Sequence, residues 1–247
     1  MKIIAMIPAR YEASRFSGKL MKDLEGKPVI VRTFEAVLNT KLFEQVYVVT
    51  DDDRIEKAIT EVGGKVIRSK KEHQSGSDRI AEACENLEAD LIVNIQGDEP
   101  FTERKNLEIL LKTFAEDIEK QISVFSLMER LNNPEDISNP NNVKVVVNKK
   151  GDALYFSRAF IPFPRDENSE GIYFKHIGIY AYRKEALMQF TQLGESILEK
   201  TEKLEQLRYL ENGFKIRLAE TNIPTIGIDT EEDLQKARQL WRKSNQL

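Results

Sequence analysis

Two hydrophobic periods alternate along the first part of the chain. Continuous apolar runs of strand length lie at 1–7, 46–50, 65–68 and 90–96. Segments with apolar residues at helical spacing separate them, at 29–40, 53–62 and 77–87. Continuous apolar strands are typical of parallel sheets covered on both faces, and strand–helix alternation is typical of right-handed βαβ units. The pattern therefore predicts an α/β fold with a doubly wound, mostly parallel sheet.

The pattern changes near residue 122, where strand-like runs follow one another with little helix between them. These runs lie at 122–130, 143–148, 153–158 and 174–183, and the KKGD sequence at 149–152 is typical of a hairpin turn. We expect an antiparallel insertion over 122–183 within a single domain that spans 1–247. Beyond it, the spacing predicts a helix over 198–213, a strand over 214–220 and a last helix from Thr230, with Asp233 at the capping-box position.

Composition narrows the classes of function. The chain has 247 residues, a formal net charge of −4 and a pI near 5.5, which argues against a general nucleic-acid binder, because such proteins carry a basic face. No apolar stretch approaches the roughly 18 residues of a membrane span, and the N-terminus lacks the features of a secretory signal, so we expect a cytoplasmic protein. The single cysteine, Cys84, excludes an internal disulfide and is predicted to be a small core residue, and the presence of only two histidines argues against a zinc site.

A short loop after the first strand carries three cations, Arg10, Arg15 and Lys19. Ligands of open α/β sheets bind at the carboxyl ends of the strands, where this loop is expected. A Walker motif is excluded, because it needs glycine where Ala13 stands and Ser or Thr where Leu20 stands, and the chain has no GxGxxG motif. We therefore predict that the side chains themselves hold a polyphosphate. The alternative is a solvated basic loop.

Two aspartates also follow apolar runs. Asp98 comes after the run at 90–96, and Asp229 ends the sequence TIGID before the last helix. Carboxylates beside bound phosphates are natural Mg²⁺ ligands. If the two strands are neighbours, both aspartates can share one cation. The alternative is that each aspartate only ends a strand or caps a helix.

Two further charged segments are interpreted structurally. The acidic run at 51–53 resembles the metal-binding DxD sequence of glycosyltransferases, but we interpret it as a helix start, because carboxylates favour the positive end of a helix. Glu205 and Arg208 lie on adjacent turns of the predicted helix. They are predicted to form an exposed salt-bridged face.

The HQSGSDR sequence at 73–79 has two equal interpretations. In the first, its small residues approach a base or sugar, and Arg79 is available to bind a carboxylate with two hydrogen bonds. In the second, the segment is an ordinary helix start that Ser77 caps.

Taken in order, the motifs of this chain resemble those of the 3-deoxy-manno-octulosonate cytidylyltransferases, also called CMP-Kdo synthetases. The motifs are IPARYEASRFSGKL, HQSGSDR, NIQGDEP, NPNNVKVV, ALYFSRAFIPFPRD, KHIGIYAYR, EKLEQLRYLENG and IGIDTEEDL, which span nearly the whole chain. The resemblance implies a Rossmann-like nucleotidyltransferase fold, Mg²⁺ as cofactor, and a homodimer joined through the antiparallel insertion. It also implies the transfer of CMP from CTP to the anomeric hydroxyl of 3-deoxy-manno-octulosonate (Kdo), an acidic 2-keto-3-deoxy sugar. Pyrophosphate is released, and the product serves lipopolysaccharide synthesis in a Gram-negative cell.

The resemblance also assigns roles to single residues. The cytidine pocket would be lined by Pro8, Ala9, Arg10, Ser75 and Gly76. The triphosphate would be held by Arg15 and Lys19, and the catalytic Mg²⁺ by Asp98 and Asp229. The acidic sugar would be surrounded by Arg79, Gln96, Arg158, His176, Tyr180, Glu205 and Gln206. Ser17 and Leu20 stand where the family commonly has prolines, so we expect a more flexible loop with the same chemistry.

Three alternative functions stay open. The nearest is a cytidylyltransferase for another acidic sugar, such as a sialic acid or an amino-substituted Kdo. A glycosyltransferase that uses the acidic run at 51–53 would release a nucleoside diphosphate instead of pyrophosphate. A non-catalytic nucleotide-binding regulator would bind CTP without turnover, but a basic loop combined with two strand-end aspartates argues against it.

Overall fold

A computed structural model describes residues 1–12, 16–71, 73, 75–166 and 171–244. The chain forms two compact units, of which the first comprises Met1–Arg104 and Thr225–Leu247 and the second comprises Lys105–Pro224. Each unit holds its own set of paired strands, and the single domain expected over 1–247 stays a prediction. Within the described ranges, no helix has both the length and the apolar character needed to cross a membrane.

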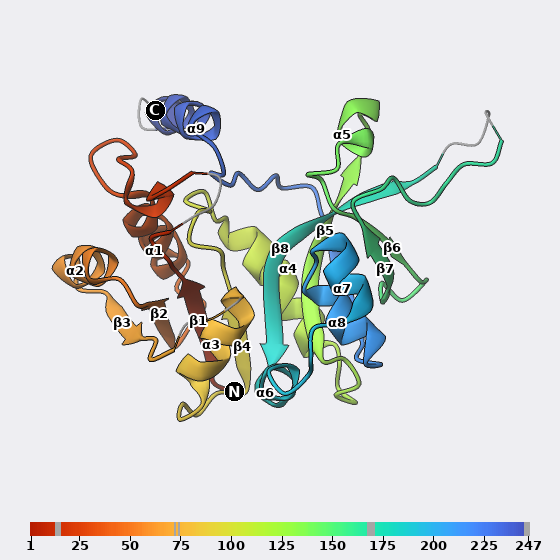
Figure 1. The fold of residues 1–247 in the computed structure, drawn as a ribbon, viewed down its shortest axis with the longest axis horizontal. Coiled ribbons are helices and arrows are strands. Elements are labelled where there is room, and N and C mark those ends of the chain that lie inside the picture. Colours follow the sequence, from red (N-terminus) through yellow and green to blue (C-terminus); the bar gives the residue numbers. More distant parts are fainter. Residues whose placement is uncertain (13–15, 72, 74, 167–170, 245–247) are drawn as a thin grey trace. The chain divides into compact units, whose positions relative to one another are not determined.

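The first unit is built on four parallel strands in the order β3-β2-β1-β4, which lie side by side in Figure 1. Their bounds are β1 Ile3–Pro8, β2 Gln45–Thr50, β3 Lys65–Arg68 and β4 Leu91–Asn94. The helices are α1 Val29–Asn39, α2 Asp53–Glu61, α3 Gly76–Cys84 and α9 Glu231–Ser244, with a short 3₁₀ helix η1 at Lys19–Met21. The strand–helix alternation predicted for this part of the chain is confirmed.

The central strands owe their position to continuous apolar sequence. All four residues of β4 are buried, and β1 is buried from Ile4 to Ile7. A strand without polar alternation presents no face to water, so it is stable only between covering layers. Cys84 is buried at the end of α3, as predicted, and its thiol donates to the Ala81 carbonyl at 3.4 Å.

Side chains cap two helices of the first unit where the sequence predicts it. The Asp52 carboxylate accepts hydrogen bonds from the backbone N–H groups of Arg54 at 2.9 Å and Ile55 at 3.4 Å, which confirms that the acidic run starts α2. At α9, the N–H of Asp233 donates to the Thr230 hydroxyl at 3.2 Å, and the N–H of Thr230 donates to the Asp233 carboxylate at 2.9 Å. This is the predicted capping box.

The predicted cap of α3 is wrong by two residues. Ser75 caps the helix, because its hydroxyl accepts the backbone N–H of Asp78 at 3.1 Å, and Ser77 is buried within the first turn. Both serines are good capping residues by type. Ser75 has the extended backbone that a cap requires, and its hydroxyl also donates to the Asp78 carboxylate at 2.8 Å.

The second unit has mixed strand directions. Strand β5 is antiparallel to β8 and parallel to β9, and β6 is antiparallel to both β7 and β8. The strands are β5 Val124–Leu131, β6 Lys144–Val147, β7 Ala153–Ser157, β8 Tyr173–Arg183 and β9 Ile216–Thr221. The helices are α4 Arg104–Ala115, α5 Pro134–Ser138, α6 Lys184–Phe190, α7 Ile197–Glu202 and α8 Gln206–Glu211. The antiparallel strands expected within 122–183 are confirmed, and Gly151, with φ +81°, provides the left-handed turn of the predicted hairpin.

The single helix predicted over 198–213 is wrong. Lys203 adopts a left-handed backbone with φ 54°, which ends α7, and α8 begins three residues later, at Gln206. The predicted exposed pair of Glu205 and Arg208 is also wrong, because Arg208 is buried and binds Glu199 of α7 with hydrogen bonds of 2.7 and 2.5 Å. The break in the helix lets α8 pack against α7, so this arginine faces a buried carboxylate instead of water.

Candidate functional site

The carboxyl ends of the strands in the first unit gather the residues that the sequence singled out. Strand β1 ends at Pro8, where the basic loop begins, and β4 ends at Asn94, shortly before Asp98. The chain returns to this place at Asp229, because the N–H of Ile228 donates to the carbonyl of Asp98 at 3.0 Å. A backbone hydrogen bond therefore joins the segments that carry the two aspartates.

The Lys19 ammonium lies between these two carboxylates. It donates a short hydrogen bond to Oδ2 of Asp98 and another, of 2.8 Å, to Oδ1 of Asp229. The side chains of Lys19 and Asp98 are 16% and 21% exposed, whereas that of Asp229 is 48% exposed. In such partly buried surroundings, opposite charges attract more strongly than in bulk water. The arrangement is a compact acidic pair that already holds one positive charge.

Opposing effects set the pKa of Lys19. Burial disfavours the charged form and lowers the pKa, but the Coulombic attraction of Asp98 and the hydrogen bonds to both carboxylates outweigh burial. The pKa of Lys19 therefore lies above its ordinary value of 10.5. The side chain is a permanent cation at neutral pH.

Gly18 sets the direction of the backbone at Lys19. Its φ of +64° is left-handed, and a Cβ at this position would lie 3.0 Å from the Tyr11 ring. The N–H of Gly18 donates to the Tyr11 carbonyl at 3.1 Å. The guanidinium carbon of Arg54 lies 3.2 Å from the centroid of the Tyr11 ring. The sequence analysis did not identify Tyr11 as a residue that shapes the basic loop, although the position of an aromatic residue among the cations of this loop is a sequence signal for such a role. Arg15, the other predicted triphosphate ligand, lies outside the described residues.

The segments predicted to hold cytidine meet at the end of β1. A Cβ added to Gly76 would lie 3.4 Å from the Pro8 ring, so the start of α3 lies against the start of the basic loop. Ala9 is buried, and its N–H donates to a carbonyl of β2 at 2.9 Å, whereas Arg10 is exposed. The structure thus places Gly76, which directly follows the capping residue Ser75, beside Pro8. Their contacts to a nucleotide stay predictions.

Arg79 already has partners within the first unit. Its guanidinium is buried and donates to the Asp51 carboxylate at 3.1 Å and to the Ser69 hydroxyl at 3.0 Å. Burial opposes ionisation of Asp51, but the hydrogen bond and charge of Arg79 outweigh it and lower the pKa of this carboxyl. Gln96, the other sugar-binding candidate of this unit, is half-buried just after β4.

The acidic run at 51–53 is occupied by protein partners. Asp51 pairs with Arg79, Asp52 caps α2, and Asp53 pairs with Arg68 at 2.7 Å. Among the residues that the structure describes, no cluster of three or more His, Cys, Asp or Glu side chains is placed to hold a metal ion. A cation beside Asp98 and Asp229 would need oxygen atoms from a bound ligand or water to complete its shell.

Two sugar-binding candidates lie together in the second unit. His176, on β8, is buried with its Nε2 at 3.1 Å from the Ser126 hydroxyl of β5, and its ring centroid lies 5.2 Å from that of Tyr180. Burial raises the pKa of Tyr180 well above 10.0, and the neighbouring Tyr182 and Glu205 raise it further. The Tyr180 hydroxyl is therefore protonated at neutral pH.

The other candidates of this unit are held by short-range contacts. Gln206 is buried at the start of α8, directly after Glu205. Arg158 follows β7, and Glu202 binds it twice: the Arg158 N–H donates to the carboxylate at 2.9 Å, and Nε donates to the Glu202 carbonyl at 2.8 Å. The fully buried Lys144 ammonium donates to the Arg158 carbonyl at 2.7 Å. These contacts fix the backbone at Arg158.

Stability is expected to fall with decreasing pH because of His176. Burial, helped by the charge of Lys175, lowers the pKa of His176 from 6.5 to about 3. Below pH 6.5, His176 therefore binds a proton in the unfolded chain, whereas in the folded chain it binds one only near pH 3. The stabilising contribution of neutral His176 to the free energy of unfolding is complete above pH 6.5 and is lost as the pH falls towards 3. The free energy of unfolding should fall by up to about 1.4 kcal/mol per pH unit in this window. Urea denaturation of the wild type and of His176→Gln measures it; an equal pH slope in both proteins would show that His176 does not titrate in this way.

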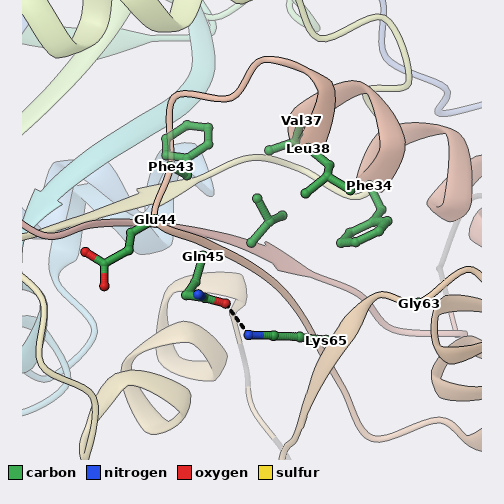
Figure 2. A pocket seen from close by; sticks show the side chains of 9 residues that line it. Phe34, Val37, Leu38, Phe43, Glu44, Gln45, Gly63 and Lys65 are labelled. Carbon is green, nitrogen blue, oxygen red and sulfur yellow. Dashed lines mark hydrogen bonds between the residues drawn. The ribbon is translucent and has the colours of Figure 1, made fainter.

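A separate pocket of about 140 Å³ lies at the amino ends of β2 and β3 (Figure 2). Its lining is mostly apolar and includes Phe34, Leu38 and Phe43, while the Lys65 ammonium donates to the Gln45 side chain at 2.5 Å. Because the strands are parallel, the pocket lies at the opposite ends of the strands from Asp98, which follows the carboxyl end of β4. The pocket is therefore distinct from the candidate site.

Comparison with known proteins identifies close relatives over the whole chain. Residues 4–216 match the cytidylyltransferase family. The chain is 57% identical over 239 residues to 3-deoxy-manno-octulosonate cytidylyltransferase of Christiangramia forsetii, covering 97% of this chain and 96% of the relative. It is 43% identical to the protein of the same name from Fusobacterium nucleatum, covering 99% of each chain.

Solved structures give the same result. The structure of CMP:2-keto-3-deoxy-manno-octonic acid synthetase in complex with CTP matches with a TM-score of 0.93 and 41% identity, covering 99% of this chain and 100% of the other. A 4-diphosphocytidyl-2C-methyl-D-erythritol synthase from Anaerococcus prevotii matches with a TM-score of 0.62 and 14% identity, covering 98% and 99%, and shows a shared fold alone. The predicted α/β fold, mostly parallel with antiparallel strands, is confirmed.

Proposed function

The chain belongs to the 3-deoxy-manno-octulosonate cytidylyltransferases, and we propose that it carries out their reaction at the carboxyl edge of the first unit, where Lys19 meets Asp98 and Asp229. The enzyme transfers CMP from CTP to Kdo. The single observation that supports this location is the contact of the Lys19 ammonium with two carboxylates, that of Asp98 after β4 and that of Asp229, which follows irregular backbone instead of the expected strand and lies just before α9.

The two carboxylates suit a divalent cation. Asp98 Oδ2 and Asp229 Oδ1 already converge on one positive charge, the Lys19 ammonium. Their oxygen atoms are the ligand type that Mg²⁺ prefers, and phosphate oxygens and water would complete the shell. When bound, Mg²⁺ neutralises phosphate charge and lowers the pKa of a coordinated hydroxyl. We therefore assign Mg²⁺ binding to Asp98 and Asp229.

Side chains of the basic loop stabilise the leaving group in this proposal. The anomeric hydroxyl of Kdo attacks the α-phosphorus in line, and the bond to the β-phosphate breaks to release pyrophosphate. Lys19 and Arg15 would neutralise the charge that accumulates on pyrophosphate, since opposite unit charges about 4 Å apart attract by roughly 4 kcal/mol at an effective dielectric near 20. A covalent intermediate is unnecessary, because such transfers depend mainly on positioning and charge stabilisation.

We assign recognition of the two substrates to the remaining candidates. Cytidine would contact Pro8, Ala9, Arg10, Ser75 and Gly76, and Kdo would contact Arg79, Gln96, Arg158, His176, Tyr180, Glu205 and Gln206. Burial supports two of these assignments in particular. His176, with its pKa near 3, and Tyr180, with its raised pKa, offer neutral hydrogen-bonding groups to sugar hydroxyls at neutral pH.

The antiparallel segment over 122–183 is proposed to join two copies of the chain. Apolar side chains of this segment are exposed in the single chain, with Leu154 62%, Phe163 74% and Ile172 53% exposed. Contact between two copies would remove this apolar surface from water. Light scattering should give the mass of a homodimer, and the mass of one chain at micromolar concentration would rule out this assembly.

Pyrophosphate release tests the substrate assignment. With CTP and Mg²⁺, we expect a higher kcat/KM for Kdo than for an amino-substituted Kdo or a sialic acid. A higher kcat/KM for either of these sugars would make it the substrate instead. Release of a nucleoside diphosphate would indicate a glycosyltransferase, and CTP binding without turnover would indicate a regulator.

A further inference from the structure

The Lys19 ammonium occupies the place where the proposed function needs a divalent cation. It is bound to Asp98 and to Asp229 at once, and the Lys19 side chain is only 16% exposed. We infer that Lys19 closes the cation site of the substrate-free protein, and that the phosphates of an arriving nucleotide draw the ammonium away so that a divalent cation enters with them. The inference rests on the proposed function, because it takes these two carboxylates as the cation ligands.

The ammonium and a divalent cation exclude each other. Both would bind the carboxylates of Asp98 and Asp229, and Lys19 already occupies Oδ2 of Asp98 and Oδ1 of Asp229. Two cations at contact distance repel each other strongly where solvent is partly excluded. A divalent cation beside Lys19 would therefore add positive charge to a site that already holds an ammonium. A nucleotide triphosphate removes this obstacle, because it supplies an alternative anion for Lys19.

The backbone that carries the two carboxylates is held independently of Lys19. The N–H of Ile228 donates to the Asp98 carbonyl at 3.0 Å, and the N–H of Asp229 donates to the carboxylate of Asp233 at 3.2 Å. The Thr33 hydroxyl donates to the carbonyl of Gly97 at 2.9 Å, immediately before Asp98. The backbone on both sides of the site is therefore fixed, and it keeps its place when the ammonium leaves.

Lys19 can leave without any movement of its backbone. The N–H of Lys19 donates to the Phe16 carbonyl at 3.2 Å, and the Lys19 carbonyl accepts the N–H of Lys22 at 3.2 Å. Gly18, packed against Tyr11, fixes the preceding residue. A lysine carries its charge on a flexible four-carbon stem with three rotatable donors. Rotation of this side chain alone exchanges the carboxylates for a phosphate.

Binding of Mn²⁺ to the nucleotide-free protein, followed by electron paramagnetic resonance of the free ion, tests the inference. Lys19→Met keeps the stem and removes the charge, so it should bind Mn²⁺ at least tenfold more tightly than the wild type. Lys19→Gln should shift the affinity in the same direction. Lys22→Met is the matched control, because Lys22 is an exposed lysine three residues away whose ammonium lies over the Phe16 ring. This control should bind Mn²⁺ as weakly as the wild type.

Two further measurements test whether the gained Mn²⁺ binds at the acidic pair. The Lys19→Met, Asp98→Asn double variant should lose the added affinity, which places the gained site at the acidic pair. Thermal unfolding in EDTA and in Mn²⁺ should show that Mn²⁺ raises the midpoint of Lys19→Met more than that of the wild type. Equal Mn²⁺ affinity in folded Lys19→Met and wild type overturns the inference. The proposed function fails separately, if Asp98→Asn keeps normal turnover.

Discussion

The Asp98→Asn protein is expected to lose turnover by roughly 10³-fold or more, because a catalytic cation supplies several kcal/mol of transition-state stabilisation and each 1.4 kcal/mol is a factor of ten. Asparagine keeps the size of the side chain and removes the charge that binds a cation. The fold should survive, because a backbone hydrogen bond from Ile228 holds this position whatever the side chain. Pyrophosphate release with saturating CTP and Kdo measures the loss, and circular dichroism checks the fold.

Asp53→Asn provides the matched control for this experiment. Asp53 also follows a parallel strand of the first unit, but its side chain is 90% exposed and pairs with Arg68. The control should keep wild-type turnover. Loss of activity in Asp53→Asn with full activity in Asp98→Asn would move the metal site to the acidic run at 51–53 and contradict the assignment to Asp98.

The second large effect is expected for stability, in the variant Arg208→Met. This change leaves the buried Glu199 carboxylate without its cation, which typically destabilises a protein by about 3–5 kcal/mol. Glu199 also accepts the N–H of Ser196 at 3.1 Å in the capping box of α7, so the start of this helix should loosen as well. Urea denaturation of wild type and variant gives the difference in the free energy of unfolding.

Lys57→Met is the control for Arg208→Met. Its partner is Glu61, and both side chains are largely exposed, so the pair contributes about 0–1 kcal/mol. A double variant, Glu199→Gln with Arg208→Met, should recover part of the lost stability because it removes the buried charge. An Arg208→Met protein as stable as the Lys57→Met protein would show that the buried pair is not a stability determinant.

The sequence predicts most of the fold because the two central strands of the first unit, β1 and β4, are short and largely buried. A run such as that of β4 has no polar alternation, and this leaves a parallel strand as its simplest interpretation. The capping box at Thr230 is predictable for a similar reason, since both partners lie within one helical turn.

Predictions fail where a distant contact decides a local structure. Periodicity alone favours one helix over 198–213, but Lys203 takes a left-handed conformation, and α8 then packs on α7. The partner of Arg208 is Glu199, nine residues away and across this break, instead of a neighbour on the same helix. Ser75 and Ser77 are equivalent as caps by residue type, and only the backbone conformation distinguishes them.

In the candidate site too, the sequence predicts which segments meet but does not predict the contacts between distant residues. The carboxyl edge of a parallel sheet brings strand-end residues together, so the sequence predicts that the loop with Lys19 faces Asp98 and Asp229. Direct contact of the ammonium with both carboxylates depends on the hydrogen bond of Ile228 to Asp98, which has no local sequence signal. The pairing of Arg79 with Asp51 is likewise a contact between separate elements, from helix α3 to the residue that follows β2.

The central claim is that Asp98 and Asp229 hold one catalytic cation together. A double-mutant cycle in kcat for pyrophosphate release, with Asp98→Asn, Asp229→Asn and both changes combined, tests it most directly. Because either substitution empties the shared site, the double variant should be little slower than the slower single variant. Losses that multiply in the double variant would mean that the two carboxylates act independently, and would contradict the account.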